Sequence, residues 1–104
     1  MLELDLPEKH LGHLRALLQT HVPDCEVWAY GSRVTGKGHE GSDLDLVVRQ
    51  PQALSQPCGL LADLCEALQN SPLPILVDVH DWASLPPAFH AEIIATHRVI
   101  QTPA

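Results

Sequence analysis

Apolar side chains recur along the chain at helical spacing in three stretches, and at strand spacing in the segments between them. The first helix is predicted to start near Asp5, which can cap it, because Pro7 suits a first turn and Glu8 makes that turn acidic. Pro23 and Asp24 end it. Its apolar stripe is Leu11, Leu14, Leu17, Leu18 and Val22.

Two further helices are predicted in the second half of the chain. One runs from Pro57 to Asn70, where Asn70, Ser71 and Pro72 stop it, and a short one runs from about Pro87 to Thr96. The apolar stripe of the longer helix is Leu60, Leu61, Leu64, Cys65 and Leu68. The side chains expected to face inward from the shorter helix are Phe89, Ile93 and Ile94.

Short apolar runs over 25–30, 44–48, 74–80 and 98–101 predict four strands, the last one brief. Residues 33–42 contain three glycines and are expected to form a loop or a short helical turn. Because the connection between the first two strands is short, we expect them to be antiparallel neighbours. The order of elements predicts an α/β fold, a small mixed sheet with helices packed on it.

Size and charge narrow the class of protein. The 104 residues fit one domain, no apolar run approaches the roughly 20 residues that span a bilayer, and the acidic N-terminus is not that of a signal peptide. A net charge of −7 argues against direct binding to nucleic acid, although metal ions allow an acidic protein to bind a nucleotide. Cys25, Cys58 and Cys65 show no zinc or disulfide pattern and are expected to be reduced thiols in a cytoplasmic protein.

The chemistry is concentrated in one segment, where Gly31-Ser32 is followed by ten residues and then by Asp43-Leu44-Asp45-Leu46. A turn of Gly and Ser allows the close backbone approach that a phosphate needs. On a strand Asp43 and Asp45 would lie about 6.6 Å apart at their Cα atoms and point the same way. Two carboxylates held so close resist ionising unless a cation such as Mg²⁺ binds them.

A third acid is predicted on the third strand. Asp78 interrupts the apolar run Val77-Asp78-Val79, where an unpaired acid would be costly. Asp78 and His80 share one face of that strand, whereas Asp81 falls on the other face or beyond the strand. Three acids of this kind suit a pair of catalytic metal ions.

These residues, Gly31-Ser32, Asp43-Leu44-Asp45 and Asp78, resemble the signature of the DNA polymerase beta-like nucleotidyltransferase superfamily, and the chain looks most like its minimal, antitoxin-type members. The resemblance implies a single minimal nucleotidyltransferase domain over residues 1–104, with a polymerase beta palm-like fold, two Mg²⁺ ions and ATP as substrate. It also implies that Gly31 and Ser32 hold the triphosphate tail, and that Asp43 and Asp45 bind both metals. Asp78 would bind one metal and help deprotonate the acceptor hydroxyl.

Other residues have two interpretations each. Arg33 could contact a phosphate or form a surface ion pair, and Lys37 could do likewise or be a solvated loop charge. Ser42 could orient Asp43 or serve the turn alone. Trp28 and Trp82 are more typical of core packing, although Trp82 could anchor a partner.

The resemblance further implies a protein adenylyltransferase that acts as an antitoxin on a HEPN-type toxin, with the partner or a second copy of the chain completing the acceptor surface. Two alternatives remain open. One is transfer to a small molecule such as an aminoglycoside, and the other is a binding module that neutralises its partner by contact alone.

Overall fold

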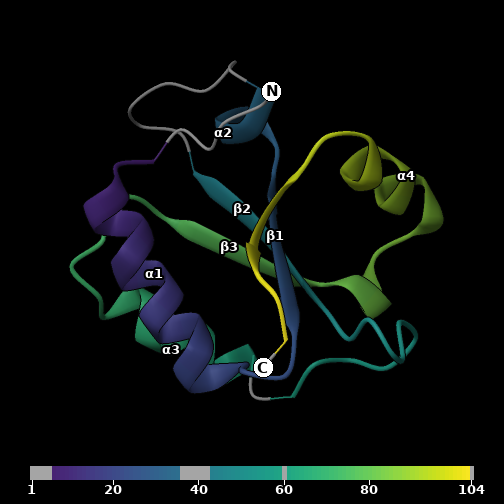
Figure 1. Ribbon diagram of the computed structural model, residues 1–104, viewed down its shortest axis with the longest axis horizontal. Helices are drawn as coiled ribbons and strands as arrows, with labels where there is room; N and C mark the ends of the chain where they lie inside the picture. The colour runs from purple at the N-terminus through teal and green to yellow at the C-terminus, as the bar shows by residue number, and fades with distance from the viewer. Residues whose placement is uncertain (1–5, 36–42, 60, 104) are drawn as a thin grey trace.

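A mixed four-stranded sheet forms the centre of the molecule in the computed structural model, which describes residues 6–35, 43–59 and 61–103 (Figure 1). The predictions for Asp5, Lys37, Ser42 and Leu60 lie outside the described residues. Within the described ranges no helix is both long and apolar enough to cross a membrane.

The strands are β1 (Glu26–Tyr30), β2 (Leu44–Arg49), β3 (Val77–Asp81) and β4 (Arg98–Gln101), in the order β3-β2-β1-β4. β1 pairs antiparallel with β2 and with β4, while β2 and β3 run parallel. The predicted antiparallel pairing of the first two strands and the predicted brief last strand are therefore confirmed.

The third strand begins later than predicted, at Val77 instead of Pro74. Proline has no backbone N–H, so Pro74 can donate no hydrogen bond to the sheet. The first contact comes just before the strand, where the backbone N–H of Leu44 donates to the carbonyl of Leu76 at 2.9 Å.

One face of the sheet is covered by α1 (Glu8–His21) and α3 (Leu61–Gln69), which lie side by side in Figure 1. Their buried leucines are the predicted stripe positions Leu14, Leu18, Leu64 and Leu68. Alternate strand residues complete this main core from the other side, among them Val27, Ala29, Leu44, Leu46 and Val48. The helical and strand periods in the sequence therefore correspond to one continuous core.

The second long helix was predicted to start at Pro57, and this is wrong, because α3 begins at Leu61. The backbone before it is bonded to side chains from elsewhere in the fold instead. Gln50 donates to the carbonyl of Pro57 at 2.6 Å, and the N–H of Cys58 donates to a carboxylate oxygen of Asp81 at 2.9 Å.

The opposite face carries the 3-10 turn η1 (Trp82–Ser84) and α4 (Pro87–Ala95), with α2 (Ser32–Thr35) at the end of β1. A second, smaller cluster lies here and consists of Trp28, Val47, Trp82 and Ile93. Both tryptophans are therefore core residues, as favoured from the sequence.

Two side chains of α4 do not face inward as predicted. Phe89 is 49% exposed and Ile94 is 56% exposed, whereas Ile93 is buried. The helix is short and apolar on several sides, and in the described part of the chain no further layer covers its outer surface. Only one stripe of it can contact the sheet.

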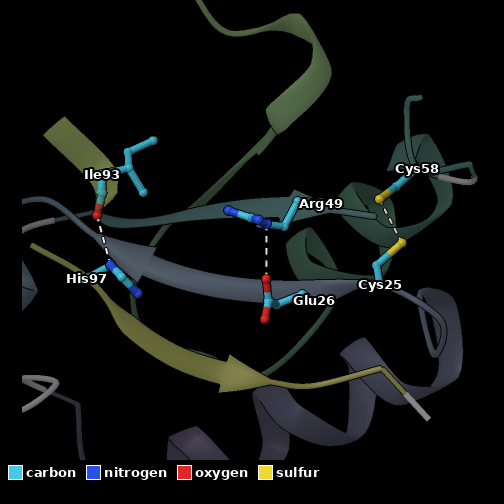
Figure 2. A network of polar contacts seen from close by, with 6 residues as sticks. All are labelled: Cys25, Glu26, Arg49, Cys58, Ile93 and His97. Carbon is cyan, nitrogen blue, oxygen red and sulfur yellow. Dashed lines mark hydrogen bonds and ion pairs between the residues drawn. The ribbon is translucent and has the colours of Figure 1, made fainter. Parts of the chain in front are cut away.

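Arg49 fastens the smaller cluster to β1. Its guanidinium lies 4.2 Å from the ring centre of Trp28 and 4.4 Å from that of Trp82. Figure 2 shows its ion pair with Glu26, at 3.0 Å. His97 stacks on Trp28 with ring centres 3.9 Å apart and contacts the carbonyl of Ile93 at 2.9 Å. These contacts hold α4 and the start of β4 against the sheet.

The three cysteines are free thiols, as predicted. Cys25 and Cys58 are buried against each other, with their sulfur atoms 2.6 Å apart (Figure 2). Burial, and then the neighbouring Cys25 thiol, raise the pKa of Cys58, so that it stays protonated at neutral pH.

Candidate active site

Gly31 makes the turn at the end of β1, and its backbone requires glycine for two reasons. Its φ of 81° lies in the left-handed region, which side chains disfavour. A Cβ atom at this position would lie 2.6 Å from Oδ2 of Asp45. The turn therefore brings backbone directly against the carboxylate of Asp45, and Val34 closes it by donating to the Gly31 carbonyl at 3.0 Å.

The parallel register of β2 and β3 places Asp45 directly beside Asp78. Leu44 and Leu46 are fully buried in the main core, so Asp45 projects from the other face of the sheet. Val77 and Val79 pack on that same core, and Asp78 and His80 are exposed on the face of Asp45, as predicted. Neighbouring strands are about 4.8 Å apart, so the two carboxylates are close neighbours.

The charges around Asp45 are mostly negative, which is typical of a site that binds a cation. Burial raises the pKa of Asp45, and the charges of Asp78 and Asp43 raise it further, while His80 opposes them. Asp43 lies just before β2 and is close enough to contribute. The ion pair between Arg49 and Glu26 lies four register positions along the sheet from Asp45 and involves none of these acids.

The acids fit a hard divalent cation by their chemistry, since carboxylate oxygens are the donors that Mg²⁺ prefers. The strand register holds Asp45 and Asp78 side by side, as two ligands of one cation would need to be. Over the ranges that the structure describes, no three His, Cys, Asp or Glu side chains already form a metal-holding group. The metal roles of Asp43, Asp45 and Asp78 therefore remain a proposal.

The predicted phosphate-binding residues lie where the turn leads into α2. Ser32 is the first residue of α2, directly after Gly31. Arg33 is buried, with 5% of its surface exposed, so a simple surface position is excluded. Contacts of Gly31, Ser32 and Arg33 with a phosphate stay predictions.

Tyr30 belongs to this site, although the sequence reasoning did not single it out. It faces Asp45 in the register of β1 and β2. Burial, followed by the charges of Asp45 and Asp78, raises its pKa to about 12, so its hydroxyl keeps its proton. The available signal was strand parity, because Tyr30 lies two residues after the inward-facing Trp28.

A cavity of about 470 Å³ opens next to the turn, between the end of β1 and α4. Its lining residues are Tyr30, Gly31, Phe89, Glu92, Ile93, Ala95 and Thr96. Apart from Tyr30 and Gly31 these residues come from α4 and its end, and no spacing in the sequence connects them to the acids.

The fold and these acids define a class of protein. Residues 13–103 match the family model described as "Polymerase beta, Nucleotidyltransferase". The chain therefore belongs to this nucleotidyltransferase family, which confirms the resemblance drawn from Gly31-Ser32 and the acids.

Individual relatives narrow the comparison. The chain is 41% identical over 101 residues to the "Probable protein adenylyltransferase MntA" of Haemophilus influenzae, covering 95% of this chain and 85% of that protein. It is 36% identical over 70 residues to human "Terminal uridylyltransferase 7", covering 67% of this chain but 5% of that protein.

A solved structure described as "Crystal structure of the toxin-antitoxin with AMP-PNP" has the same fold, with a TM-score of 0.71. The identity is 20%, and the match covers 88% of this chain and 73% of that one. At that identity the likeness confirms the α/β fold. The family match and the relative from Haemophilus influenzae make the chain a nucleotidyltransferase.

Proposed function

We propose that this nucleotidyltransferase transfers AMP from ATP to a hydroxyl group of a protein partner, and that it acts in the cytoplasm as the antitoxin of a HEPN-type toxin. The observation that carries the enzymatic part is the pairing of Asp45 with Asp78 beside the Gly31 turn. A protein as the acceptor is supported by the 41% identity to a relative named as a probable protein adenylyltransferase. The toxin partner and the nucleotide are supported by the description of the structural relative.

In the proposed reaction the acceptor oxygen attacks the α-phosphorus of ATP. A bond forms between these two atoms, the bond from the α-phosphorus to the bridging oxygen of the β-phosphate breaks, and pyrophosphate leaves. Asp78 takes up the hydroxyl proton, while the turn at Gly31 and Ser32 holds the triphosphate tail through backbone N–H groups. Two Mg²⁺ ions held by Asp43, Asp45 and Asp78 would stabilise the negative charge on the attacking and leaving oxygens.

A protein acceptor suits the edge of the sheet at Asp78. β3 is an edge strand, and Leu76, two residues before Asp78, is 69% exposed. A hollow of about 280 Å³ lies against this end of β3 and is lined by Leu73, Pro74, Leu76 and Asp78 together with the end of α3. An apolar side chain next to a catalytic acid is better suited to a polypeptide than to a highly polar small molecule.

The test is an incubation of the chain with Mg²⁺, ATP labelled at the α-phosphate, and the product of the adjacent gene. We expect the partner to gain the label and the mass of one AMP. Asp43→Asn should abolish the transfer, whereas Asp63→Asn, an exposed acid on α3, should leave it unchanged.

The alternatives give different results in the same experiment. Full neutralisation of the partner by Asp43→Asn without any label would indicate a binding module that acts by contact. Label on an aminoglycoside but on neither protein would indicate a small-molecule transferase. Either result would overturn the proposed acceptor, and the first would also overturn the need for catalysis.

A further inference from the structure

The cavity between β1 and α4 shares two residues with the candidate active site. Gly31 lines the cavity and also lies against the carboxylate of Asp45. Tyr30 lines it as well and is paired with Asp45 across the sheet. The space is therefore continuous with the place where the polyphosphate is proposed to bind.

The lining of the cavity is apolar with a few polar groups. Ile93 forms a buried wall, and Phe89 contributes a ring that is 49% exposed. Glu92 and Thr96 are polar, and Tyr30 adds a hydroxyl that stays protonated. Small-molecule sites are of this kind, because apolar walls provide affinity and a few polar groups fix orientation.

We propose that this cavity binds the nucleoside part of the nucleoside triphosphate, with the base stacked on Phe89 and a hydrogen-bond donor of the nucleoside directed to Glu92. The inference rests on the proposed function, since it deepens the choice of substrate at that same site. A phosphate chain anchored at Gly31 carries its nucleoside only a few bonds away, and the cavity begins at Gly31.

Glu92 gives the cavity a preference for ligands with a hydrogen-bond donor, which its apolar walls cannot provide. An ionised carboxylate accepts hydrogen bonds and does not donate them. It can therefore bind the exocyclic amino group of adenine or cytosine, or a ribose hydroxyl. A uracil base has no amino group to offer, so the two sources of the donor can be separated by experiment.

The first experiment measures binding of a non-hydrolysable ATP analogue, with Mg²⁺ present, to the wild type and to Phe89→Ala. Base stacking on an aromatic ring is worth about 1–3 kcal/mol, so we expect the dissociation constant to rise about fivefold or more. Binding of inorganic tripolyphosphate should not change. Ile94→Ala is the matched control, because Ile94 is exposed on the same helix and does not line the cavity.

The second experiment uses Glu92→Ala with Glu66→Ala, an exposed position on α3, as its control. Weaker binding of ATP analogues with unchanged binding of UTP analogues identifies the base amino group as the donor. Weaker binding of both, with unchanged binding of a 2′-deoxy-ATP analogue, identifies the ribose 2′-hydroxyl, and weaker binding of all three nucleotides identifies another donor of the nucleoside. Unchanged binding of all three nucleotides would overturn the role of Glu92.

The proposal is overturned if Phe89→Ala leaves ATP binding unchanged, or weakens ATP and tripolyphosphate equally. Label transfer distinguishes this failure from failure of the proposed function. If Phe89→Ala still transfers the label to the partner with the wild-type KM for ATP, only the cavity proposal is overturned. Cavity-dependent ATP binding without transfer to any protein would sink the proposed function alone.

Discussion

The backbone of Gly31 packs so tightly against the carboxylate of Asp45 that a Cβ atom there would lie 2.6 Å from Oδ2. Two independent restraints act on Gly31, its φ of 81° and the lack of room for a Cβ atom. Two causes also act on Asp45, burial and the neighbouring charges of Asp78 and Asp43. The ionised carboxylate of Asp45 therefore opposes stability, which is typical of positions kept for function.

Gly31→Ala should lower both activity and stability. The left-handed backbone costs a residue with a side chain about 1–2 kcal/mol, and the new Cβ atom must displace Asp45. A displacement of about 1 Å at a reacting group can cost about 100-fold in rate, so we expect a loss of that order in label transfer.

Gly12→Ala is the matched control for this substitution. Gly12 lies in α1 with nothing within 4 Å of a Cβ atom, so alanine there should stabilise the helix by about 0.5–1 kcal/mol. If Gly12→Ala lowered the transfer rate and the melting temperature as much as Gly31→Ala does, the specific role of Gly31 would be contradicted.

Asp45→Asn should make the protein more stable at neutral pH when divalent cations are removed by a chelator. The folded state raises the pKa of Asp45 above its ordinary value of 3.8, so the charged form opposes folding. Because the group is partly exposed, we expect a gain of at most about 1 kcal/mol, or roughly 4–8 °C in melting temperature.

The sign of the pH dependence follows from the direction of that shift. The gain should be present above the folded-state pKa of Asp45 and shrink as the pH falls towards 3.8, because the wild-type carboxyl then becomes neutral. Melting curves across this range for Asp45→Asn and for Asp63→Asn test it. An equal gain in both variants would attribute the effect to net charge.

The sequence contained enough to predict the acids and the turn, because their chemistry depends on spacing along one segment. Asp43, Asp45 and Gly31 follow from local spacing, and Asp78 follows from an acid in an apolar strand. Phe89 and Glu92 could not be found in this way. They meet the site only because α4 returns over the end of β1, which is a tertiary contact with no local period.

The side chain of Asp81 links the end of β3 to segments on both sides of the strand. Asp81 is the last residue of β3 and is buried on the face opposite to Asp78, which is the first of the two positions predicted for it, and it accepts two backbone hydrogen bonds. One comes from Cys58 in the segment before α3 at 2.9 Å, and the other from Ala83 in η1 at 3.2 Å. It therefore joins the strand that carries Asp78 to both of its neighbours in the chain.

Asp81→Ala should destabilise the fold by about 2 kcal/mol, because a buried N–H group loses its partner and η1 loses its cap. Denaturant unfolding measures the loss, with Glu66→Ala on the exposed face of α3 as the control. Since Asp81 lies three residues from Asp78, binding of nucleotide should change little at temperatures where the variant is folded. An unfolding midpoint equal to that of the wild type would contradict the role given to Asp81.

The elements themselves were predictable where one period dominated, and less so where distant side chains intervened. The leucine stripes of α1 and α3 and the alternation of β2 are local patterns, and they are confirmed. The start of α3 was missed because Gln50 and Asp81 bind the backbone before it. Such a bond can connect residues that are distant in sequence, as Cys58 and Asp81 are, so no local pattern predicts it.

The two faces of the sheet differ in what they carry. The face under α1 and α3 carries the main core, while the other carries the aromatic cluster, the acids and the cavity. The site lies at the end of the sheet where β1 finishes and where β2 and β3 begin, and the thiols of Cys25 and Cys58 lie at the opposite end. Substitution of the thiols is therefore expected to affect stability more than the reaction.

A net charge of −7 makes the response to Mg²⁺ the most informative property of the whole chain, because diffuse binding to an acidic surface has to be distinguished from binding at the site. Site binding to the folded state alone should stabilise it by about 1.4 kcal/mol at a tenfold excess of Mg²⁺ over its dissociation constant. The resulting rise in melting temperature should vanish in Asp45→Asn, persist in Asp63→Asn, and be absent when sodium chloride matches the ionic strength. It should also fade with acidification from a pH above 3.8, because protons and metal compete for Asp45, whose pKa is raised. Equal shifts in both variants would mean that the ions bind the surface and that the acids do not form the metal site.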